Sequence, residues 1–349
     1  MSDKYELIEP REIDGVTFYR IRALKYFGNQ YPGSEGGLIE KVANLSQTGL
    51  SWVGYDSRVY GDARVFDDAH IGARVGIAVN GSAVRVYGQA QIYDRALVFG
   101  NVQVYGQAQI YDQAWVSDGV CVYGEAQIYG SSNVHGYAQI YDKAQVFDCA
   151  TIFTNVRVNG NAKVYNNAQI YNKHPGDYST PNLIGPHIWG NARVYGSARV
   201  HGLMDGNSQA YGKAINDGSI HDDAQLYGDA YLDGSLKGHA KVYGNARIYD
   251  ANIYGNARVY GSACVGRTKS RGYDRIDIYE NAKIYGNARV MGNTTVRGNA
   301  RVFGTVQVTD TAVNVIAEDT QISDTTPSVN EATNVSRGRA VSPIPRKNA

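Results

Sequence analysis

The sequence predicts an all-β fold, a single-stranded parallel β-helix (β-solenoid) in which three six-residue strands complete each 18-residue coil. Val or Ile recurs at every sixth position from Val86 to Ile170, with no insertion or deletion. The stretch VYGQAQIYD at 86–94 returns letter for letter at 104–112, and VYGEAQIYG follows at 122–130. The pattern therefore repeats at six residues and again at 18, and it lacks the 3.6-residue apolar stripe of a helix.

Each six-residue unit has the form A-x-[VI]-[YF]-[GDN]-x, as in the stretch from Ala90 to Arg95. Alternate residues of a strand point to the same side, so the small residue and the aliphatic residue both face inward. The Gly, Asp or Asn that follows tolerates the turn conformations that end a short strand. Each unit thus predicts one short strand and one turn.

The 18-residue period sorts the strands into three faces. The inner aliphatic residues are Val86, Val104 and Val122 on the first face, Ile92, Ile110 and Ile128 on the second, and Val98, Val116 and Val134 on the third. Equivalent residues of successive coils should lie one strand spacing apart, about 4.8 Å. Like side chains then stack into ladders, as the repeated outward Gln residues of the second face suggest. The sequence therefore predicts a three-sided prism.

Aromatic residues follow the inner aliphatic residues in two columns and supply the candidate binding residues. The first face carries Tyr87, Tyr105, Tyr123 and Tyr141, and the second carries Tyr93, Tyr111 and Tyr129. Rows of exposed rings are typical of contact surfaces, and we expect them to meet a protein partner, further copies of the chain in a trimer, or a glycan. The alternative is that Tyr is present only because it favours strands and stacks well.

The chain divides into three predicted regions. Residues 1–50 do not repeat and are predicted to form an N-terminal cap or attachment segment, because a solenoid end exposes core and unpaired strand edges. Residues 51–316 are predicted to form the solenoid. Residues 317–349 are rich in Ser, Thr and Asn and are predicted to be an extended polar C-terminal arm.

Irregularities interrupt the six-residue count inside the predicted solenoid. The segments 173–187 and 266–275 are predicted to be loop insertions that leave the prism. The count also slips between Ile71 and Val86 and is ragged from 203 to 238. These are the places where the sequence predicts the coils least well.

Composition excludes several classes of protein. The formal net charge of +1 gives no reason to expect nucleic acid or an anionic membrane surface as a partner. No apolar run is long enough to span a membrane, and the charged start MSDKYELIEP is unlike a secretory signal. An odd number of cysteines without metal-ligand spacing fits synthesis in the reducing cytoplasm: Cys121, Cys149 and Cys264.

The histidines are the candidate catalytic bases. His135 and His201 occupy the slot in which Tyr usually sits, which indicates substitution within a ladder. His174 and His187 flank the first insertion, where they could act as bases or bind a metal, or simply belong to a surface loop. The other three histidines are His70, His221 and His239.

Acidic residues raise the alternative of a bound cation, although we expect no metal and no cofactor. The stretch His-Asp-Asp at 221–223 has ligand-like residues but also the composition of a polar turn. Asp94 and Asp112 should stack at one corner, with Asp148 two coils further on. A cation such as calcium would relieve the repulsion between stacked carboxylates, whereas Asp in a solvated turn would need none.

The repeat resembles that of the hexapeptide-repeat proteins, in which an aliphatic residue is followed four positions later by a small one. Val86 with Ala90 and Ile92 with Ala96 fit that pattern, but Tyr or Phe directly after the aliphatic residue departs from it. The stretches GGLIEKVANLSQTGLSWV and SRVYGDARV are more similar to bacterial and bacteriophage NARVYG-repeat proteins, which are often labelled transferases. The resemblance covers residues 33–316 and implies a left-handed β-helix.

Three functions are consistent with these observations. The first is a non-enzymatic, rigid β-solenoid with a structural or binding role, which the resemblance implies is a virion-associated phage or prophage protein such as a decoration, fibre or tail component. The second is a hexapeptide-type acyltransferase, in which a His would act as general base. The third is a glycan-binding protein that uses its Tyr ladders.

Overall fold

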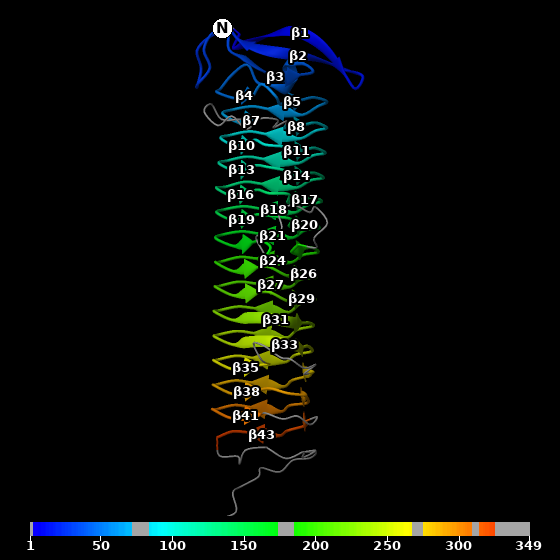
Figure 1. The fold of residues 1–349 in the computed structure, drawn as a ribbon, viewed down its shortest axis with the longest axis vertical. Coiled ribbons are helices and arrows are strands. Elements are labelled where there is room, and N and C mark those ends of the chain that lie inside the picture. Colours follow the sequence, from blue (N-terminus) through cyan, green and yellow to red (C-terminus); the bar gives the residue numbers. More distant parts are fainter. Residues whose placement is uncertain (1–2, 72–83, 174–184, 267–274, 309–313, 325–349) are drawn as a thin grey trace, which may run out of the picture. The chain divides into compact units, whose positions relative to one another are not determined.

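The computed structural model describes residues 3–71, 84–173, 185–266, 275–308 and 314–324. Apart from one 3-10 turn, η1 (Val42–Asn44), every element in these ranges is a β-strand, so the all-β prediction is confirmed (Figure 1). Within the same ranges, no helix has the length and apolar character needed to cross a membrane. The chain divides into two compact units, Met1–Gly190 and Asn191–Ala349.

The first unit winds into a parallel β-solenoid with the three predicted faces. Its first face contains β3 (Glu35–Ile39), β5 (Arg58–Val59), β8 (Arg85–Val86), β11 (Gln103–Val104), β14 (Cys121–Val122), β17 (Gln139–Ile140), β20 (Arg157–Val158) and β23 (His187–Ile188). The second contains β6 (Arg64–Val65), β9 (Gln91–Ile92), β12 (Gln109–Ile110), β15 (Gln127–Ile128), β18 (Gln145–Val146) and β21 (Lys163–Val164). The third contains β4 (Trp52–Val53), β7 (His70–Ile71), β10 (Leu97–Val98), β13 (Trp115–Val116), β16 (Asn133–Val134), β19 (Thr151–Ile152) and β22 (Gln169–Ile170).

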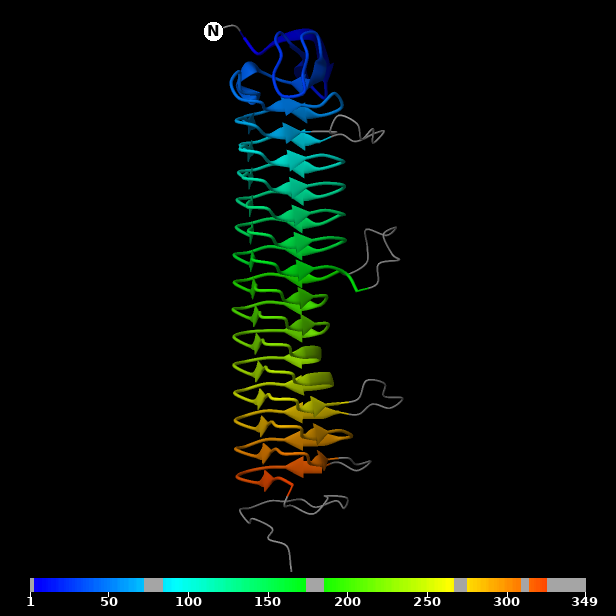
Figure 2. The ribbon, with the colours of Figure 1, turned by 90° about the vertical axis from the view of Figure 1, so that its left-hand side faces the viewer.

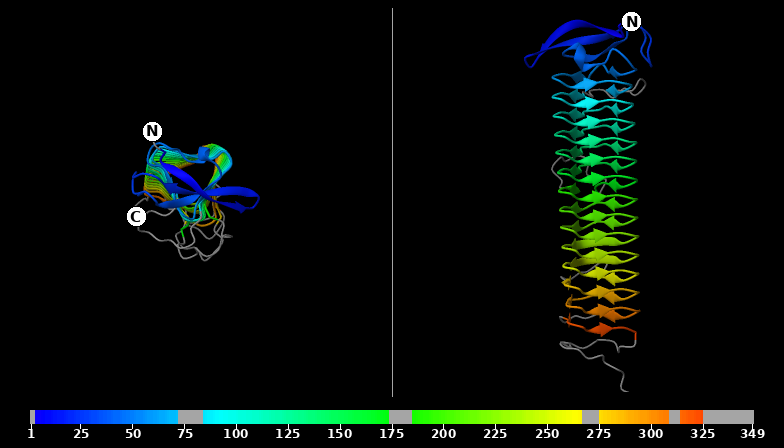
Figure 3. Two further views of the ribbon diagram at one scale, coloured as in Figure 1. Left: turned by 90° about the horizontal axis from the view of Figure 1, so that it is seen from above. Right: turned by 180° about the vertical axis from the view of Figure 1, so that it is seen from behind.

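Strand register confirms the 18-residue coil between residues 85 and 173. Val86 pairs with Val104, and Ile110 pairs with Ile128, in parallel ladders. The hydrogen bonds run from coil to coil, as where the Tyr87 N–H donates to the Val104 carbonyl at 3.0 Å. Seen from above in Figure 3, the coils of each unit trace a three-sided outline.

The core of each coil is formed by the inner residues that the pattern predicts. Ala90, Ile92, Ala96 and Val98 all have 0% exposed surface, and the same holds for their equivalents in the following coils. Burial of such side chains stabilises the fold by about 25 cal/mol per Å² of apolar surface. Every coil contributes to one continuous column of apolar residues within its unit.

An antiparallel hairpin forms the N-terminal end of the first unit. β1 (Tyr5–Ile13) pairs with β2 (Val16–Ala23), which pairs with β3 on its other side. β3 in turn pairs in parallel with β5, so it joins the hairpin to the first coils. The free edge of β1 contains charged residues, Pro10 and a register shift, which are features that discourage further strand pairing.

Buried polar residues fix this hairpin against the coils. Lys4 is 1% exposed, and its Nζ donates to the carbonyl of Ser51 at 2.9 Å. Burial lowers the pKa of Lys4 to about 8. The Tyr5 hydroxyl donates to the Leu45 carbonyl at 2.6 Å, and burial raises the pKa of that hydroxyl. Such partners are required because an unsatisfied buried polar group is costly.

The second unit has the same three faces. Its second face contains β24 (Arg193–Val194), β27 (Gln209–Ala210), β30 (Gln225–Leu226), β32 (Lys241–Val242), β34 (Arg258–Val259), β37 (Lys283–Ile284), β40 (Arg301–Val302) and β43 (Gln321–Ile322). Its third face contains β25 (Arg199–Val200), β28 (Ile215–Asn216), β35 (Cys264–Val265), β38 (Arg289–Val290) and β41 (Gln307–Val308). Its first face contains β26 (Leu203–Met204), β29 (Ser219–Ile220), β36 (Ile276–Ile278), β39 (Thr294–Val296) and β42 (Asn314–Ile316). Two longer strands, β31 (Tyr231–Leu236) and β33 (Arg247–Ile253), continue from the third face into the first. Figure 2 shows the strands of successive coils aligned within each unit.

The ragged stretch of sequence at 203–238 winds in coils of 16 residues. Val194 pairs with Ala210, and Ala210 pairs with Leu226, each pair 16 positions apart. The spacing becomes 17 where Val242 pairs with Val259, and returns to 18 where Ile284 pairs with Val302. The 18-residue coil therefore holds for the regular parts of the chain, and the raggedness reflects shorter coils rather than a loss of the fold.

The insertions all fall between a third-face strand and a first-face strand. Val59 pairs with Val86, 27 positions away, so the slip at 72–83 is an additional insertion. β23 begins at His187, which therefore lies in a strand and not in the predicted loop 173–187. Of the two predicted loops, residues 174–184 and 267–274 lie outside the described residues.

The coils of the second unit continue past residue 316, the predicted end of the solenoid. β43 pairs with β40, and Ile322 is only 4% exposed. Residues 317–324 therefore belong to the last described coil. The remainder of the predicted C-terminal arm, 325–349, lies outside the described residues, and the left-handed winding implied by the resemblance stays a prediction.

Candidate functional site

The seven predicted site tyrosines form two ladders in the first unit. Tyr87, Tyr105, Tyr123 and Tyr141 stack with ring centroids 4.8–5.0 Å apart and interplanar angles of 2–4°. Tyr93, Tyr111 and Tyr129 stack with centroids 4.8–4.9 Å apart and angles of 1–3°. The inference that residues 18 apart are neighbours is therefore confirmed ring by ring. Whether these residues bind a partner stays a prediction.

Stacking determines which parts of the Tyr rings a partner could contact. Each ring covers the face of the next, so ring edges and hydroxyl groups are presented to solvent rather than open aromatic platforms. Burial and the neighbouring ladder tyrosines raise the pKa of Tyr111 and of Tyr123 to about 12. The hydroxyls are therefore protonated hydrogen-bond donors at neutral pH. Stacking of a sugar ring on these faces, which the glycan hypothesis would use, is hindered by the neighbouring rings.

Sequence reasoning missed further members of both ladders. Tyr60 stacks on Tyr87 at 5.1 Å, and Phe66 stacks on Tyr93 at 4.9 Å. Both lie 27 residues before their partners, because the insertion at 72–83 falls between them. A Tyr or Phe directly after Val59 and Val65 was the available signal.

The second unit has a longer ladder that the ragged sequence concealed. Its rings stack at 4.8–5.0 Å on the second face: Tyr195, Tyr211, Tyr227, Tyr243, Tyr260, Tyr285 and Phe303. Burial and the neighbouring Tyr195 and Tyr227 raise the pKa of Tyr211 to about 12. Ladders of this kind are thus common to both units.

The predicted Gln column also forms a ladder in the first unit. The side-chain amide of Gln127 donates to Gln109 at 3.2 Å, and that of Gln145 donates to Gln127 at 2.8 Å. Amide ladders are favourable because each side chain is both donor and acceptor for its neighbours. From Gln109 to Gln145, the second face of the first unit therefore presents neutral amides that are already hydrogen-bonded to one another.

The acidic corner is explained by turn chemistry. Asp94 and Asp112 have φ values of 56° and 58°, a conformation that Asp tolerates better than most residues. The Asp94 carboxylate accepts the Asp112 N–H at 3.2 Å, and the Asp112 carboxylate accepts the Gly130 N–H at 3.0 Å. Asp148 does the same for the Asn166 N–H at 3.1 Å. Each carboxylate therefore has a backbone partner one coil further on.

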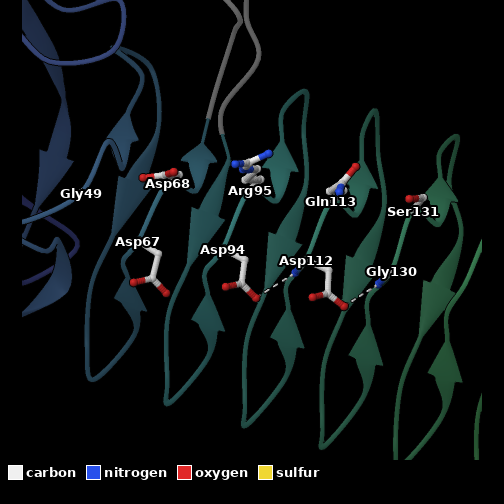
Figure 4. Close-up of a pocket in the computed structure, with 9 residues that line it drawn as sticks. All are labelled: Gly49, Asp67, Asp68, Asp94, Arg95, Asp112, Gln113, Gly130 and Ser131. Carbon is white, nitrogen blue, oxygen red and sulfur yellow. Dashed lines mark hydrogen bonds between the residues drawn. The ribbon is translucent and has the colours of Figure 1, made fainter.

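An open groove of about 560 Å³ follows these turns. Figure 4 shows Asp67, Asp94 and Asp112 in a row, with Arg95 and Gln113 beside them. Among the described residues, no group of three or more His, Cys, Asp or Glu side chains is arranged to hold a metal ion. The groove is thus a consequence of repeated turns along one corner, and the cation alternative is not tested by it.

Most histidines are paired within the coils. His135 stacks on Phe153 at 5.4 Å, as expected for a ladder substitution, and burial lowers its pKa. Nε2 of His187 lies 2.6 Å from Oδ1 of Asn159. Nδ1 of His221 lies 2.9 Å from Oδ2 of Asp205, in the neighbouring coil. His174 lies outside the described residues.

The residues of the ligand-like stretch 221–223 each make a different contact and do not converge on one point. The Asp222 carboxylate accepts the Gly238 N–H at 2.9 Å, while Asp223 accepts a hydrogen bond from Asn207 at 2.8 Å. Nδ1 of His239 lies 3.4 Å from Asp223. These residues therefore form a polar turn, which was the second of the two sequence interpretations.

His201 is more than a substitution within a ladder, because it belongs to a buried network. Its Nδ1 lies 2.5 Å from Oδ1 of Asp217, and their side chains are only 9% and 5% exposed. The Tyr231 hydroxyl donates to the other Asp217 oxygen at 2.6 Å. Burial and this hydrogen bond raise the pKa of Tyr231. Buried charges of this kind are expected to be paired, and the network fixes the corner between the third and first faces.

Comparison with known proteins supports the fold. A family model for the YdcK beta-solenoid repeat matches this chain at residues 90–106, 188–202, 251–267 and 282–298. No curated protein matches the chain. The matched segments fall on the coils described above, and together with the stacked parallel strands they identify the chain as a β-solenoid repeat protein.

Proposed function

We propose that this chain is a non-enzymatic, rigid β-solenoid with a structural role, made in the cytoplasm and assembled into a bacteriophage or prophage virion. The observation that carries the proposal is the uninterrupted stacking of short coils by hydrogen bonds and aromatic ladders within each unit. Such stacking resists bending because each coil is held by its neighbours. The resemblance to bacterial and phage NARVYG-repeat proteins supports the virion assignment.

The proposal gives the Tyr ladders of the first unit a role as contact surface for a protein partner, including further copies of the chain. Their hydroxyl-lined edges fit polar contacts at an interface, where Tyr is enriched. Three free cysteines, at positions 121, 149 and 264, are consistent with folding in a reducing compartment.

In this proposal the N-terminal cap or the C-terminal arm attaches the protein to the particle, and two truncations test this role for the arm. Removal of 325–349 leaves β43 intact and should keep the melting temperature of the full chain, while the truncated protein is lost from purified particles. Removal of 318–349 also deletes β43 and should lower the melting temperature, because Ile322 no longer covers the last coil. Detection of the full chain by mass spectrometry only in the soluble fraction, with none on particles, would contradict the virion assignment.

A separate measurement tests the absence of catalysis. Titration of the full chain with acetyl-CoA in a calorimeter should give no saturable heat. A saturable signal that disappears in His187→Ala, or in His174→Ala, would instead support the acyltransferase hypothesis. A glycan array tests whether the Tyr ladders of the first unit bind neutral sugars, and we expect no signal from neutral glycans.

A further inference from the structure

Four positively charged residues form a continuous row on the second face of the second unit. Lys241 pairs with Arg258, Arg258 with Lys283, and Lys283 with Arg301, so each lies one coil from the next. We call Lys241, Arg258, Lys283 and Arg301 the basic row. Neighbouring strands are about 4.8 Å apart, so four like charges are held at a spacing at which they repel one another.

The basic row has no acidic partner to offset this repulsion. Within the described part of the chain, none of its four side chains forms an ion pair or a side-chain hydrogen bond. Arg258 and Arg301 are exposed, and Lys241 and Lys283 are partly exposed. On one of the preceding turns, the carboxylate of Glu280 accepts the backbone N–H of Gly298 at 2.6 Å.

Hydrogen-bonding side chains lie on both sides of the basic row. On one side, Asn256 donates to Asn281 at 3.2 Å, and Asn281 donates to Asn299 at 3.3 Å. On the other side stand Tyr243, Tyr260 and Tyr285, with their rings stacked. Each Asn amide has one more N–H than its ladder uses. The coils of Arg258, Lys283 and Arg301 therefore each have an Asn amide two residues before the cation, whereas His239 takes that position before Lys241. A phenol hydroxyl follows the cation in all but the last coil.

The Tyr ladder and the basic row share one surface, because each Tyr stands two residues after its cation and alternate residues point to the same side. Burial raises the pKa of Tyr260, while Arg258 and Arg301 act in the opposite direction. Arg258 has the same lowering influence on the pKa of Tyr243. The Tyr hydroxyls thus remain donors at neutral pH in a positive field.

We infer that this surface binds a linear acidic polysaccharide, whose successive carboxylates pair with Lys241, Arg258, Lys283 and Arg301. A ligand with one carboxylate per sugar has a repeat similar to one strand spacing, and its hydroxyls match the Asn and Tyr groups beside the basic row. Binding would relieve the repulsion among the four cations and form charge-assisted hydrogen bonds. The inference goes beyond the proposed structural role and does not depend on it.

Other polyanions fit this surface less well. Single-stranded nucleic acid is usually held by stacking of its bases on open aromatic faces. Here the ring faces are covered by their ladder neighbours, with centroids 4.9 Å apart. The basic row offers charge and hydrogen bonds but no stacking platform, which favours a carbohydrate.

The test uses the full chain and polygalacturonate, a linear polymer with one carboxylate per sugar, in biolayer interferometry at low salt. We expect binding that weakens as salt is raised. A variant with all four basic-row residues changed to Gln should bind with an affinity at least about tenfold lower, since complementary electrostatic fields raise association rates by about 10- to 1000-fold. Gln occupies the same slot in the first unit, as at Gln109 and Gln127, so the variant should fold, and circular dichroism and melting would check this.

Control variants test whether binding depends on this surface or only on the overall charge of the protein. A charge-matched variant changes four exposed arginines of the first unit to Gln and should bind like the wild type: Arg64, Arg85, Arg95 and Arg157. The milder pair Arg258→Gln with Lys283→Gln should weaken binding by an intermediate amount. The converse variant, with Gln91, Gln109, Gln127 and Gln145 each changed to Lys, should bind more tightly than the wild type.

Several results would overturn the inference. One is wild-type protein that does not bind polygalacturonate. Another is a folded quadruple variant that binds as tightly as the wild type. A third is an equal loss of affinity in the quadruple variant and in the charge-matched control. Binding of an oligothymidylate but not of polygalacturonate would show that the surface recognises nucleic acid instead. Each outcome is readable whether or not the protein proves to be a virion component.

Discussion

The 18-residue coils of the first unit and the 16-residue coils at the start of the second unit share three faces but differ at one corner. Between the third and first faces, the first unit takes six residues from Val98 to Val104. The second unit takes four, from Val200 to Met204. The other two corners keep the six-residue step, so both missing residues belong to this corner.

This difference shows which part of the repeat can vary. The inner residues of each strand fix the faces, while one corner accommodates changes in length. The segments 72–83, 174–184, 267–274 and 309–313 lie outside the described residues, and in the sequence each stands between a third-face strand and a first-face strand. A loop that joins two strands without contributing to the core can change length at little cost.

The two forms of the corner also differ in the residues that they require. In the long corner, equivalent positions with positive φ are occupied by Gly100, Asp118, Gly136 and Thr154. At the same distance after the third-face strand, the short corner has Gly202, Gly218 and Gly234 in three successive coils, and their φ values are not positive. A Cβ on Gly218 would lie 2.0 Å from the Gly234 carbonyl oxygen. The short corner therefore brings backbones of neighbouring coils too close for any side chain.

The largest expected effect comes from the core of the long coils. Ile128 has 0% exposed surface and pairs with Ile110 and Val146, so Ile128→Ala should lower the free energy of unfolding by about 3.5 kcal/mol. At the same slot of a short coil the chain already has Ala210, and Ala210→Gly should cost about 1 kcal/mol. Urea unfolding of both variants measures the contrast. Equal losses of unfolding free energy in the two variants would show that the two kinds of coil do not differ in core packing at this face.

Gly218→Ala should cost about 3 kcal/mol, because the new methyl group meets backbone atoms that cannot move aside. The matched change in the long corner is Gly136→Asn, which should cost less, about 2 kcal/mol, because a Cβ there would lie 2.7 Å from the Thr154 backbone nitrogen, against 2.0 Å for the contact at Gly218. Asn also tolerates the positive φ, and Asp118 and Thr154 already occupy equivalent positions. Thermal unfolding monitored by circular dichroism would compare them. A Gly218→Ala variant as stable as the wild type would mean that the short corner is less tight than described.

Asn216→Val should lower stability by about 2 kcal/mol, although Val fits the repeat pattern better. Asn216 has 0% exposed surface, its Oδ1 accepts the Gly218 N–H at 3.1 Å, and its amide donates to the Leu203 carbonyl at 3.3 Å. The short corner thus uses a core side chain to satisfy backbone groups. A more stable Asn216→Val variant would show that Asn is present for another reason.

The smallest expected effect is a loss of stability at alkaline pH, which the two units should share. Tyr111 and Tyr211 both have a folded pKa of about 12, above the unfolded value of 10.0. The folded state then holds its protons more tightly, so the ladder contribution is fully present below about pH 10 and is lost as the pH rises towards 12. Melting temperature and tyrosinate absorbance, followed together, should change over this range.

Single replacements test whether the units behave alike in alkali. Tyr111→Phe and Tyr211→Phe should each reduce the alkaline loss of stability by a similar small amount, and Phe147 shows that Phe is accepted in a ladder. Tyrosines that ionise well before any loss of stability, in either unit, would contradict the coupling between ladder stacking and ionisation.

The sequence predicted the faces, the inner residues and the ladders wherever the repeat is regular. Ile110 and Ile128 could be placed in contact because a two-residue alternation and an 18-residue period agree on their positions. The 16-residue coils were not predicted, because the shortened corner breaks the count, and Ala210 and Asn216 take aliphatic slots. The close approach of coils at Gly218 cannot be inferred from a glycine that looks like any other turn glycine.

Some features of the site had signals that could have been found. Three His–Asp contacts of the second unit join residues 16 apart: His201 with Asp217, Asp205 with His221, and Asp223 with His239. The basic row was missed because the spacing from Lys241 to Arg258 is 17 and that from Arg258 to Lys283 is 25. Once the coils are aligned, unrelated positions in the sequence become neighbours.

The most direct test of the account is an experimental density map at side-chain resolution. It should place the rings of Tyr105 and Tyr123, 18 residues apart, at 4.9 Å, and those of Tyr211 and Tyr227, 16 residues apart, at 4.8 Å. A map in which Tyr211 lies instead beside Asp229, as one fixed 18-residue period would require, would contradict the idea that a single corner adjusts the length of each coil.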